Sequence, residues 1–177
     1  MKPTNLAFLT TSALFSMCFS TSSFADVNYH IDINQPIHHL AQVSVSFPQS
    51  QSSELVVNLP VWRTGRYQVL PVADGVRLFN ATDSKGHALP WRRTASGEWT
   101  VSLTKPTAVK VTYQLHANEL GDRLRHIDES HAYLDASGVF MYSPEFRHEP
   151  ISVEMSVPKG WNSFSGMDKG PKPHSFT

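Results

Sequence analysis

The feature that most constrains this chain is the alternation of apolar and polar residues at a period of two. It recurs in six segments, which are residues 27–33, 43–47, 55–59, 99–103, 109–115 and 151–157. Because successive side chains of a strand point to opposite faces, this period predicts strands with one face in a core and the other in water. Such half-buried strands are typical of antiparallel sheets, so the sequence predicts an all-β fold.

Short turn signals rich in Gly, Pro and Ser separate the strand patterns. They are Phe47-Pro48, Ser84-Lys85-Gly86, Ser96-Gly97, Lys105-Pro106, Ser137-Gly138 and Pro158-Lys159-Gly160. Many short strands at this spacing predict an antiparallel β-sandwich of short strands with at most one short helix. Residues 120–134 have some helical spacing, but Gly121 weakens it, so we expect a loop or extended chain there, with a short helix as the alternative.

The first 25 residues have the pattern of a secretory signal peptide. Lys2 gives a positive start, an apolar run follows at residues 6–19, and Ser23 and Ala25 place small residues at a cleavage site. The alternative, a membrane anchor, needs about 20 apolar residues, and this run is shorter. We therefore expect residues 1–25 to be removed before Asp26, with no membrane anchor afterwards and with export to a bacterial periplasm or the extracellular space.

Residues 26–177 form one expected domain, and its composition excludes several classes of function. The whole chain is 40% hydrophobic and 17% charged, as in globular proteins. Lys plus Arg and Asp plus Glu both number 15, so no net field recruits nucleic acid or an anionic membrane. The one cysteine, Cys18, leaves with the signal peptide, which excludes thiol catalysis and cysteine-rich zinc sites.

A search for catalytic motifs finds none that is complete. The chain has no G-x-S-x-G elbow and no glycine-rich phosphate loop. Its nearest approach to a zinc peptidase motif begins at His148-Glu149, but Pro150 forbids an ordinary helix interior and Ser152 stands in place of the second histidine. We therefore expect no catalytic residue and no catalytic zinc site within this chain.

One group of histidines is compatible with metal binding. His126, Asp128 and His131 could converge on one ion if their loop folds back, because imidazole and carboxylate are suitable ligands. The interpretation that we prefer from the sequence is a solvated loop with a local salt link to Arg123 or Arg125, without a metal. By contrast, the neighbouring His38 and His39 would point to opposite faces of a strand and could not chelate one ion together.

The stretch LPVWRTGRYQV, residues 59–69, joins a strand end to a turn. Thr64-Gly65 supplies the turn, and Trp62 and Tyr67 would bury large apolar areas on either side of it. We interpret Trp62, Gly65 and Tyr67 as a structural corner of the sandwich. The alternative is a platform for a ligand.

Four segments in order also resemble a known family. They are LPVWRTGRYQV, DGVRLFNATDSKGHALPW with a later Trp99, VTYQLHANELGDRLRHIDESHAYLDASGVFMY, and ISVEMSVPKGW. Together they are similar to the N-terminal domain of the glycyl aminopeptidase family of zinc metallopeptidases, peptidase family M-sixty-one, from about Val27 to the end. Thr64 departs from the family pattern, since it stands where the W-x-P-G-x-Y corner has proline.

The resemblance implies a β-rich, non-catalytic domain that docks on a thermolysin-like catalytic domain of the same polypeptide. That missing domain would hold the zinc, so no cofactor is expected in this chain, and the sandwich would wall one side of the cleft that receives the peptide substrate. The loop at Gly170-Pro171 also reads as leading into another strand, so we expect a truncated product or fragment. By position, Tyr133 and Tyr142 are the candidate cleft residues, with ordinary packing as their alternative.

Two other functions remain open from the sequence. One is a self-sufficient periplasmic module that binds peptide or carbohydrate through Trp62, Tyr67, Trp91 and Trp99. Trp99 weakens that hypothesis, because it shares the inward face of its strand with Val101 and Leu103. The other is a free-standing enzyme, which would need a metal at the His126 loop.

Overall fold

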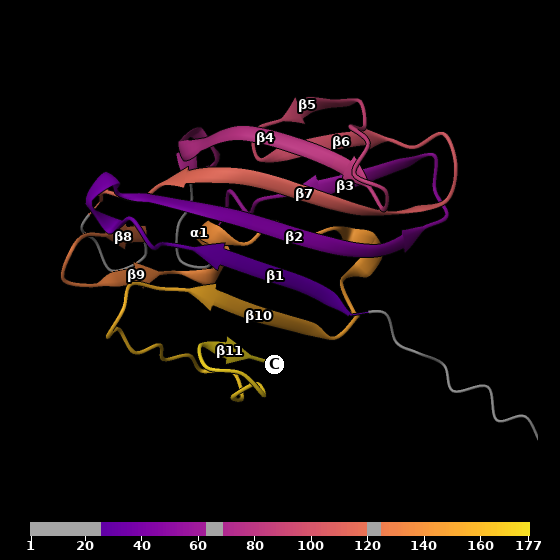
Figure 1. The fold of residues 1–177 in the computed structure, drawn as a ribbon. Coiled ribbons are helices and arrows are strands. Elements are labelled where there is room, and N and C mark those ends of the chain that lie inside the picture. Colours follow the sequence, from indigo (N-terminus) through magenta and orange to yellow (C-terminus); the bar gives the residue numbers. More distant parts are fainter. Residues whose placement is uncertain (1–25, 63–68, 120–124) are drawn as a thin grey trace, which may run out of the picture.

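Figure 1 shows the computed structural model of the chain, which describes residues 26–62, 69–119 and 125–177. The strands are β1 (Val27–Asp32), β2 (Leu40–Ser50), β3 (Glu54–Asn58), β4 (Val76–Asp83), β5 (Trp91–Ala95), β6 (Glu98–Ser102), β7 (Thr107–His116), β8 (Arg125–Ile127), β9 (Ala132–Leu134), β10 (Ile151–Ser156) and β11 (Ser175–Phe176). The helical elements are the short α-helix α1 (Ala136–Val139) and the 3-10 turns η1 (Pro36–His38), η2 (Pro71–Gly75) and η3 (Pro144–Phe146). The predicted all-β class with little helix is confirmed.

The strands form three sheets. The largest has the order β11-β10-β1-β2-β7-β4, a second has the order β3-β6-β5, and β8 and β9 form a separate hairpin (Figure 1). All six segments predicted from the alternation are strands, namely β1, β2, β3, β6, β7 and β10. The extended chain expected at residues 120–134 is confirmed where it is described, because residues 125–127 and 132–134 are β8 and β9.

The alternation did not predict β4 and β5, and each has a physical reason. Every residue of β5 is exposed, so no alternation marks that strand. In β4 the register shifts between Arg77 and Asn80, and Leu78 there has a φ of 50° and is 75% exposed. A β-bulge of this kind interrupts the period of two.

One pairing departs from the expected antiparallel arrangement. β1 runs parallel to β10, with Val27 opposite Ile151 and Ile31 opposite Met155, while β1 and β2 are antiparallel. Alternation reports which residues of a strand face the core, but it carries no information on the direction of the neighbouring strand. The parallel pair was therefore outside the reach of the pattern.

The core lies between the inner face of the large sheet and the three-stranded sheet. Phe79 of β4 stacks on Trp99 of β6, with ring centroids 5.3 Å apart and an interplanar angle of 6°. Trp99 is 3% exposed, which confirms its expected inward position. Burial of a large apolar side chain contributes about 1.5–3 kcal/mol, so such residues across the two sheets hold the sandwich together.

Among the described residues, no helix has the length and hydropathy that a membrane crossing requires.

We expect Gly97→Ala to lower the free energy of unfolding by more than about 1 kcal/mol. Gly97 lies in the turn between β5 and β6 with a φ of 75°, and a Cβ there would meet the carbonyl oxygen of Leu59 at 2.5 Å. Urea unfolding of the full chain measures the loss. Gly86→Ala is the matched control, because Gly86 has a φ of 83° but open space around it, so it should lose about 1 kcal/mol from the backbone strain. Equal losses in the two variants would contradict the steric argument.

Candidate functional site

Two buried tyrosines fix the segment that follows α1 against the inner face of the large sheet. The hydroxyl of Tyr113 on β7 donates to the carbonyl oxygen of Val139 at 2.7 Å and accepts from the amide of Met141 at 3.1 Å. The hydroxyl of Tyr29 on β1 donates to the carbonyl oxygen of Met141 at 2.9 Å. Val139 and Met141 are fully buried, so these bonds satisfy backbone groups that water cannot reach.

Burial also changes the acidity of the two tyrosines. It raises the pKa of Tyr29 to about 12. Burial raises the pKa of Tyr113 further, and the hydrogen bond from the Met141 amide offsets only part of that effect. Both hydroxyls therefore remain protonated donors over the physiological pH range, which keeps the segment in place.

The same segment is attached to the three-stranded sheet through Tyr142. The amide of Asn58 donates to the carbonyl oxygen of Tyr142 at 2.7 Å, and the amide of Tyr142 donates back to Asn58 at 2.8 Å. Asn58 is the last residue of β3. The backbone of Tyr142 thus bridges the segment and the second sheet, and this fixes where its half-buried side chain lies.

Tyr142 lines a surface groove of about 370 Å³. Phe47 and Phe146 stack in this groove with ring centroids 5.9 Å apart, and Ile151, which is 44% exposed, lies at its edge. Ser143 and Arg147 also belong to the lining, and the hydroxyl of Ser143 is buried with no hydrogen-bond partner among the described residues. The groove is therefore mainly apolar, with Arg147 as its one charged lining residue.

Tyr133, the other candidate cleft residue, lies elsewhere. It is on β9, opposite His126 of β8, and is 46% exposed. It does not belong to the residues that line the groove of Tyr142. The structure therefore does not bring the two tyrosines together in that groove.

The corner predicted around residues 62–67 is only partly described. Gly65 and Tyr67 lie outside the described residues, so their predicted role is untested. Trp62 is 57% exposed, whereas the corner interpretation expected it to be buried. The alternation that buries Leu55, Val57 and Leu59 has odd positions inward, so Trp62 falls on the outward side. Trp91, on the exposed strand β5, is 42% exposed and packs edge-on against Phe79 at 4.8 Å.

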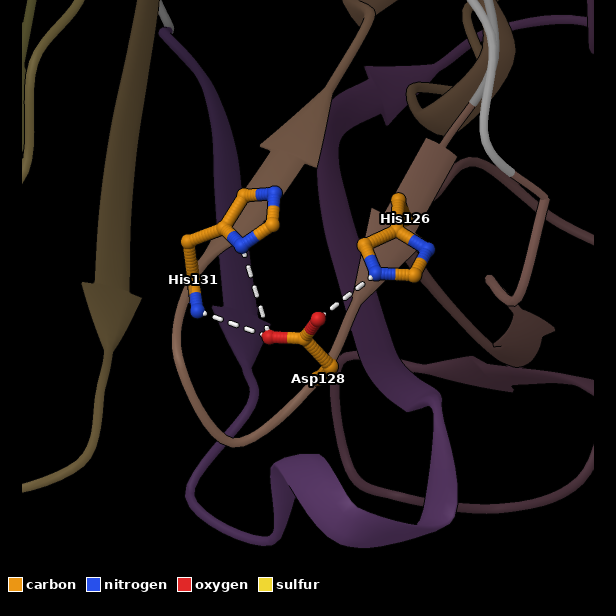
Figure 2. A group of neighbouring side chains, drawn as sticks. All are labelled: His126, Asp128 and His131. Atoms are coloured by element: carbon orange, nitrogen blue, oxygen red, sulfur yellow. Dashed lines mark hydrogen bonds and ion pairs between the residues drawn. The ribbon is translucent and has the colours of Figure 1, made fainter.

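The β8–β9 hairpin brings His126, Asp128 and His131 together, as Figure 2 shows. Nε2 of His126 lies 2.9 Å from one carboxylate oxygen of Asp128, and Nδ1 of His131 lies 3.4 Å from the other. The hydrogen bond from His126, together with those from Ser130 and the His131 amide, holds the pKa of Asp128 far below its ordinary value. Asp128 is thus a carboxylate held between two imidazoles.

Asp128 pairs with His126 and His131, and the salt link predicted to Arg123 or Arg125 stays a prediction. Arg123 lies outside the described residues. Arg125 donates through Nε to the carbonyl oxygen of His116 at 2.8 Å and through a terminal nitrogen to that of Gly138 at 2.6 Å. These bonds attach the hairpin to β7 and to α1.

Comparison with known protein families matches residues 28–177 to the Peptidase M61 N-terminal domain. This chain belongs to that family. The match covers nearly all the described residues and confirms the resemblance seen in the four sequence segments. The groove, the two buried tyrosines Tyr29 and Tyr113 and the β8–β9 hairpin therefore all lie within the M61 N-terminal domain.

Solved structures add a likeness of fold. The aminopeptidase N family protein from Idiomarina loihiensis aligns with 85% of this chain and 26% of its own length, at 22% identity and a TM-score of 0.76. A mutant form of the M1 zinc metallopeptidase from Deinococcus radiodurans aligns with 85% of this chain and 37% of its own length, at 13% identity. Its TM-score of 0.47 is too low to support an inference about this chain. A search of curated proteins found no match. The chain therefore spans about a quarter of the Idiomarina protein that shares its fold.

Sequence reasoning missed the two residues that organise this M61 N-terminal domain. Tyr29 and Tyr113 were counted only as apolar positions of predicted strands. A signal was present, because a tyrosine on the inward face of a strand needs a partner for its hydroxyl. That partner lies 26 residues away from Tyr113 and 112 from Tyr29, a separation that no local pattern reveals.

We expect the stability of the domain to fall as pH rises above about 10. The pKa of Tyr29 is about 12 in the folded state, so the unfolded chain loses this proton first. Each buried tyrosine then lowers the free energy of unfolding by up to about 1.4 kcal/mol per pH unit, whereas its full contribution is present at neutral pH. Urea titrations at about pH 9 and about pH 11 measure this slope.

Tyr29→Phe and Tyr113→Phe are the variants that assign the alkaline slope. Each removes one titrating hydroxyl, so each should unfold with a shallower dependence on pH than the unmodified chain. Tyr113→Phe should also be less stable at neutral pH by about 1–3 kcal/mol, because it leaves the buried amide of Met141 without its acceptor. If the free energy of unfolding depends on pH equally in both variants and the unmodified chain, the pKa values of these hydroxyls are not raised by folding.

Proposed function

We propose that this chain is the non-catalytic N-terminal domain of an exported zinc metallo-aminopeptidase. The domain docks on a thermolysin-like catalytic domain of the same polypeptide and walls one side of the cleft that receives the peptide substrate. The observation that carries the proposal is the M61 N-terminal domain match over residues 28–177. The 26% coverage of the Idiomarina protein supports it, because it is what an N-terminal part of a larger peptidase would give.

Tyr142 and its groove support the cleft-wall role. The groove combines stacked aromatic rings with the exposed edge of Ile151. Such a surface can pack against apolar side chains of a partner domain or a peptide, with the charged Arg147 beside them. The backbone of Tyr142 is fixed by two hydrogen bonds to Asn58. Its ring can therefore limit the position of a substrate without taking part in the chemistry.

The proposal assigns the zinc and the bond-breaking residues to the catalytic domain. Activation of water and polarisation of the peptide carbonyl are the chemistry that a zinc ion supplies in such enzymes. This chain contributes orientation and exclusion of water at the cleft. Residues 1–25 serve as the signal peptide, which places the parent protein in a periplasm or outside the cell.

The first test is the intact mass of the native protein, purified from the host with an antibody against residues 26–177. We expect residues 1–25 to be absent from the native protein. We also expect its mass to be far above that of residues 26–177. A product that ends near Thr177 would contradict the peptidase proposal. It would favour the rival function, a periplasmic binding module, for which the 57% exposed Trp62 supplies an aromatic surface.

The second test is Tyr142→Ala in that native protein. We expect the kcat/KM for short peptides with an N-terminal glycine to fall about tenfold or more, because the wall that positions the peptide is lost. Zinc content should not change, since the catalytic metal lies in the other domain and Tyr142 is not a metal ligand. Phe164→Ala is the control, because Phe164 is 91% exposed and lies outside the groove. An unchanged kcat/KM in Tyr142→Ala would show that Tyr142 does not position the substrate in the cleft.

A further inference from the structure

The turn between β8 and β9 gathers ligand atoms from three side chains. One ligand atom each from His126, Asp128 and His131 lies within 4.8 Å of the other two. His126 is in β8, Asp128 follows that strand directly, and His131 precedes β9, so one tight turn supplies all three (Figure 2). The amide of Asp128 donates to the carbonyl oxygen of His131 at 3.0 Å, which closes the turn.

The distances within this group can be compared with those around one metal ion. Two ligands bound about 2.1 Å from a tetrahedral Zn²⁺ lie about 3.4 Å apart. Nε2 of His126 is 2.9 Å from Asp128 Oδ2, and Nδ1 of His131 is 3.4 Å from Asp128 Oδ1. Nδ1 of His131 also lies 2.8 Å from Ser130 Oγ. An ion that enters the group would replace this hydrogen bond and the one between His126 and Asp128, and the side chains would move apart to hold it.

The carboxylate is already oriented for this role. Oδ1 of Asp128 accepts hydrogen bonds from the amide and the hydroxyl of Ser130, both at 2.7 Å, and from the amide of His131 at 2.9 Å. These bonds fix the plane of the carboxylate and direct Oδ2 toward His126 (Figure 2). Outer hydrogen bonds that fix a ligand in this way are typical of metal sites.

His126 is the buried ligand of the group. It is 7% exposed, and Nε2 is the nitrogen that faces the carboxylate. Its Nδ1 is buried with no hydrogen-bond partner among the described residues. Coordination through Nε2 moves the proton of that nitrogen to Nδ1 or to solvent, and it breaks no hydrogen bond at Nδ1.

From this geometry we propose that His126, Asp128 and His131 bind one divalent transition-metal ion, with Zn²⁺ as the best match. Two imidazoles favour zinc and its neighbours over calcium or magnesium, which prefer oxygen ligands. Three protein ligands leave the remaining position to water. The ion would lock the hairpin, which carries Tyr133 opposite His126. This site is distinct from the catalytic zinc of the proposed function and does not depend on it.

The test is a calorimetric titration of the metal-free full chain with Zn²⁺. We expect one ion per chain to bind and the thermal midpoint of unfolding to rise with the Zn²⁺ concentration. The imidazole nitrogen resonances of His126 and His131 should shift on binding in the nuclear magnetic resonance spectrum. Binding without a shift of these resonances would overturn the proposal, as would the absence of stoichiometric binding.

Two variants test the ligands without removing the buried histidine. His131→Gln changes a side chain that is 57% exposed, and Asp128→Asn keeps an oxygen that can accept the turn hydrogen bonds. We expect each to weaken Zn²⁺ binding by about tenfold or more. Affinity equal to that of the unmodified chain in both variants would overturn the assignment.

His87→Gln is the matched control. His87 Nδ1 lies 3.1 Å from Asp83 Oδ2, a histidine–carboxylate pair at a similar distance that is not part of the three-ligand group. This variant should bind Zn²⁺ as tightly as the unmodified chain. If it weakens binding as much as His131→Gln does, the ion is held by scattered histidines and the proposed site is wrong.

Discussion

The hydroxyl of Tyr113 is the interaction on which the rest of the structure depends. It lies in the middle of the core, donates to Val139 and accepts from Met141, and so pairs backbone groups of an irregular segment where no strand is available to do so. Leaving such groups unpaired in the interior costs about 1–3 kcal/mol each. With Tyr29 bound to the same segment, the chain after α1 covers part of the inner face of the large sheet.

Both surfaces of interest follow from that cover. Beyond Met141 the chain reaches Asn58 through Tyr142 and forms the groove with Phe47 and Phe146. Before α1 the chain forms the β8–β9 hairpin, which Arg125 attaches to the carbonyl oxygens of His116 and Gly138. The groove and the histidine cluster are therefore positioned by a few polar bonds to a rigid sheet, which is how a small domain can present precise surfaces on irregular segments.

The period of two located six strands because each has one buried and one solvated face, and it put Trp99 correctly in the core. It failed where a strand lacks that contrast, as in the fully exposed β5, or where a bulge breaks it, as at Leu78 of β4. The interpretation of residues 59–69 as a corner expected Trp62 to be buried, although its side chain is 57% exposed. The four segments identified the family through their order and spacing, which are kept where individual residues such as Thr64 differ from the family pattern.

By itself, therefore, the sequence determined the class of fold, the inward face of the main strands and membership of a peptidase N-terminal domain family. These properties are written in local periodicity and in the order of motifs along the chain. Tertiary structure alone decided that β1 runs parallel to β10, that Tyr142 enters a groove which Tyr133 does not line, and that Asp128 stands between His126 and His131. Each of these depends on how distant segments meet or how a turn closes, and partners such as Tyr29 and Met141 are brought together only by the packed core.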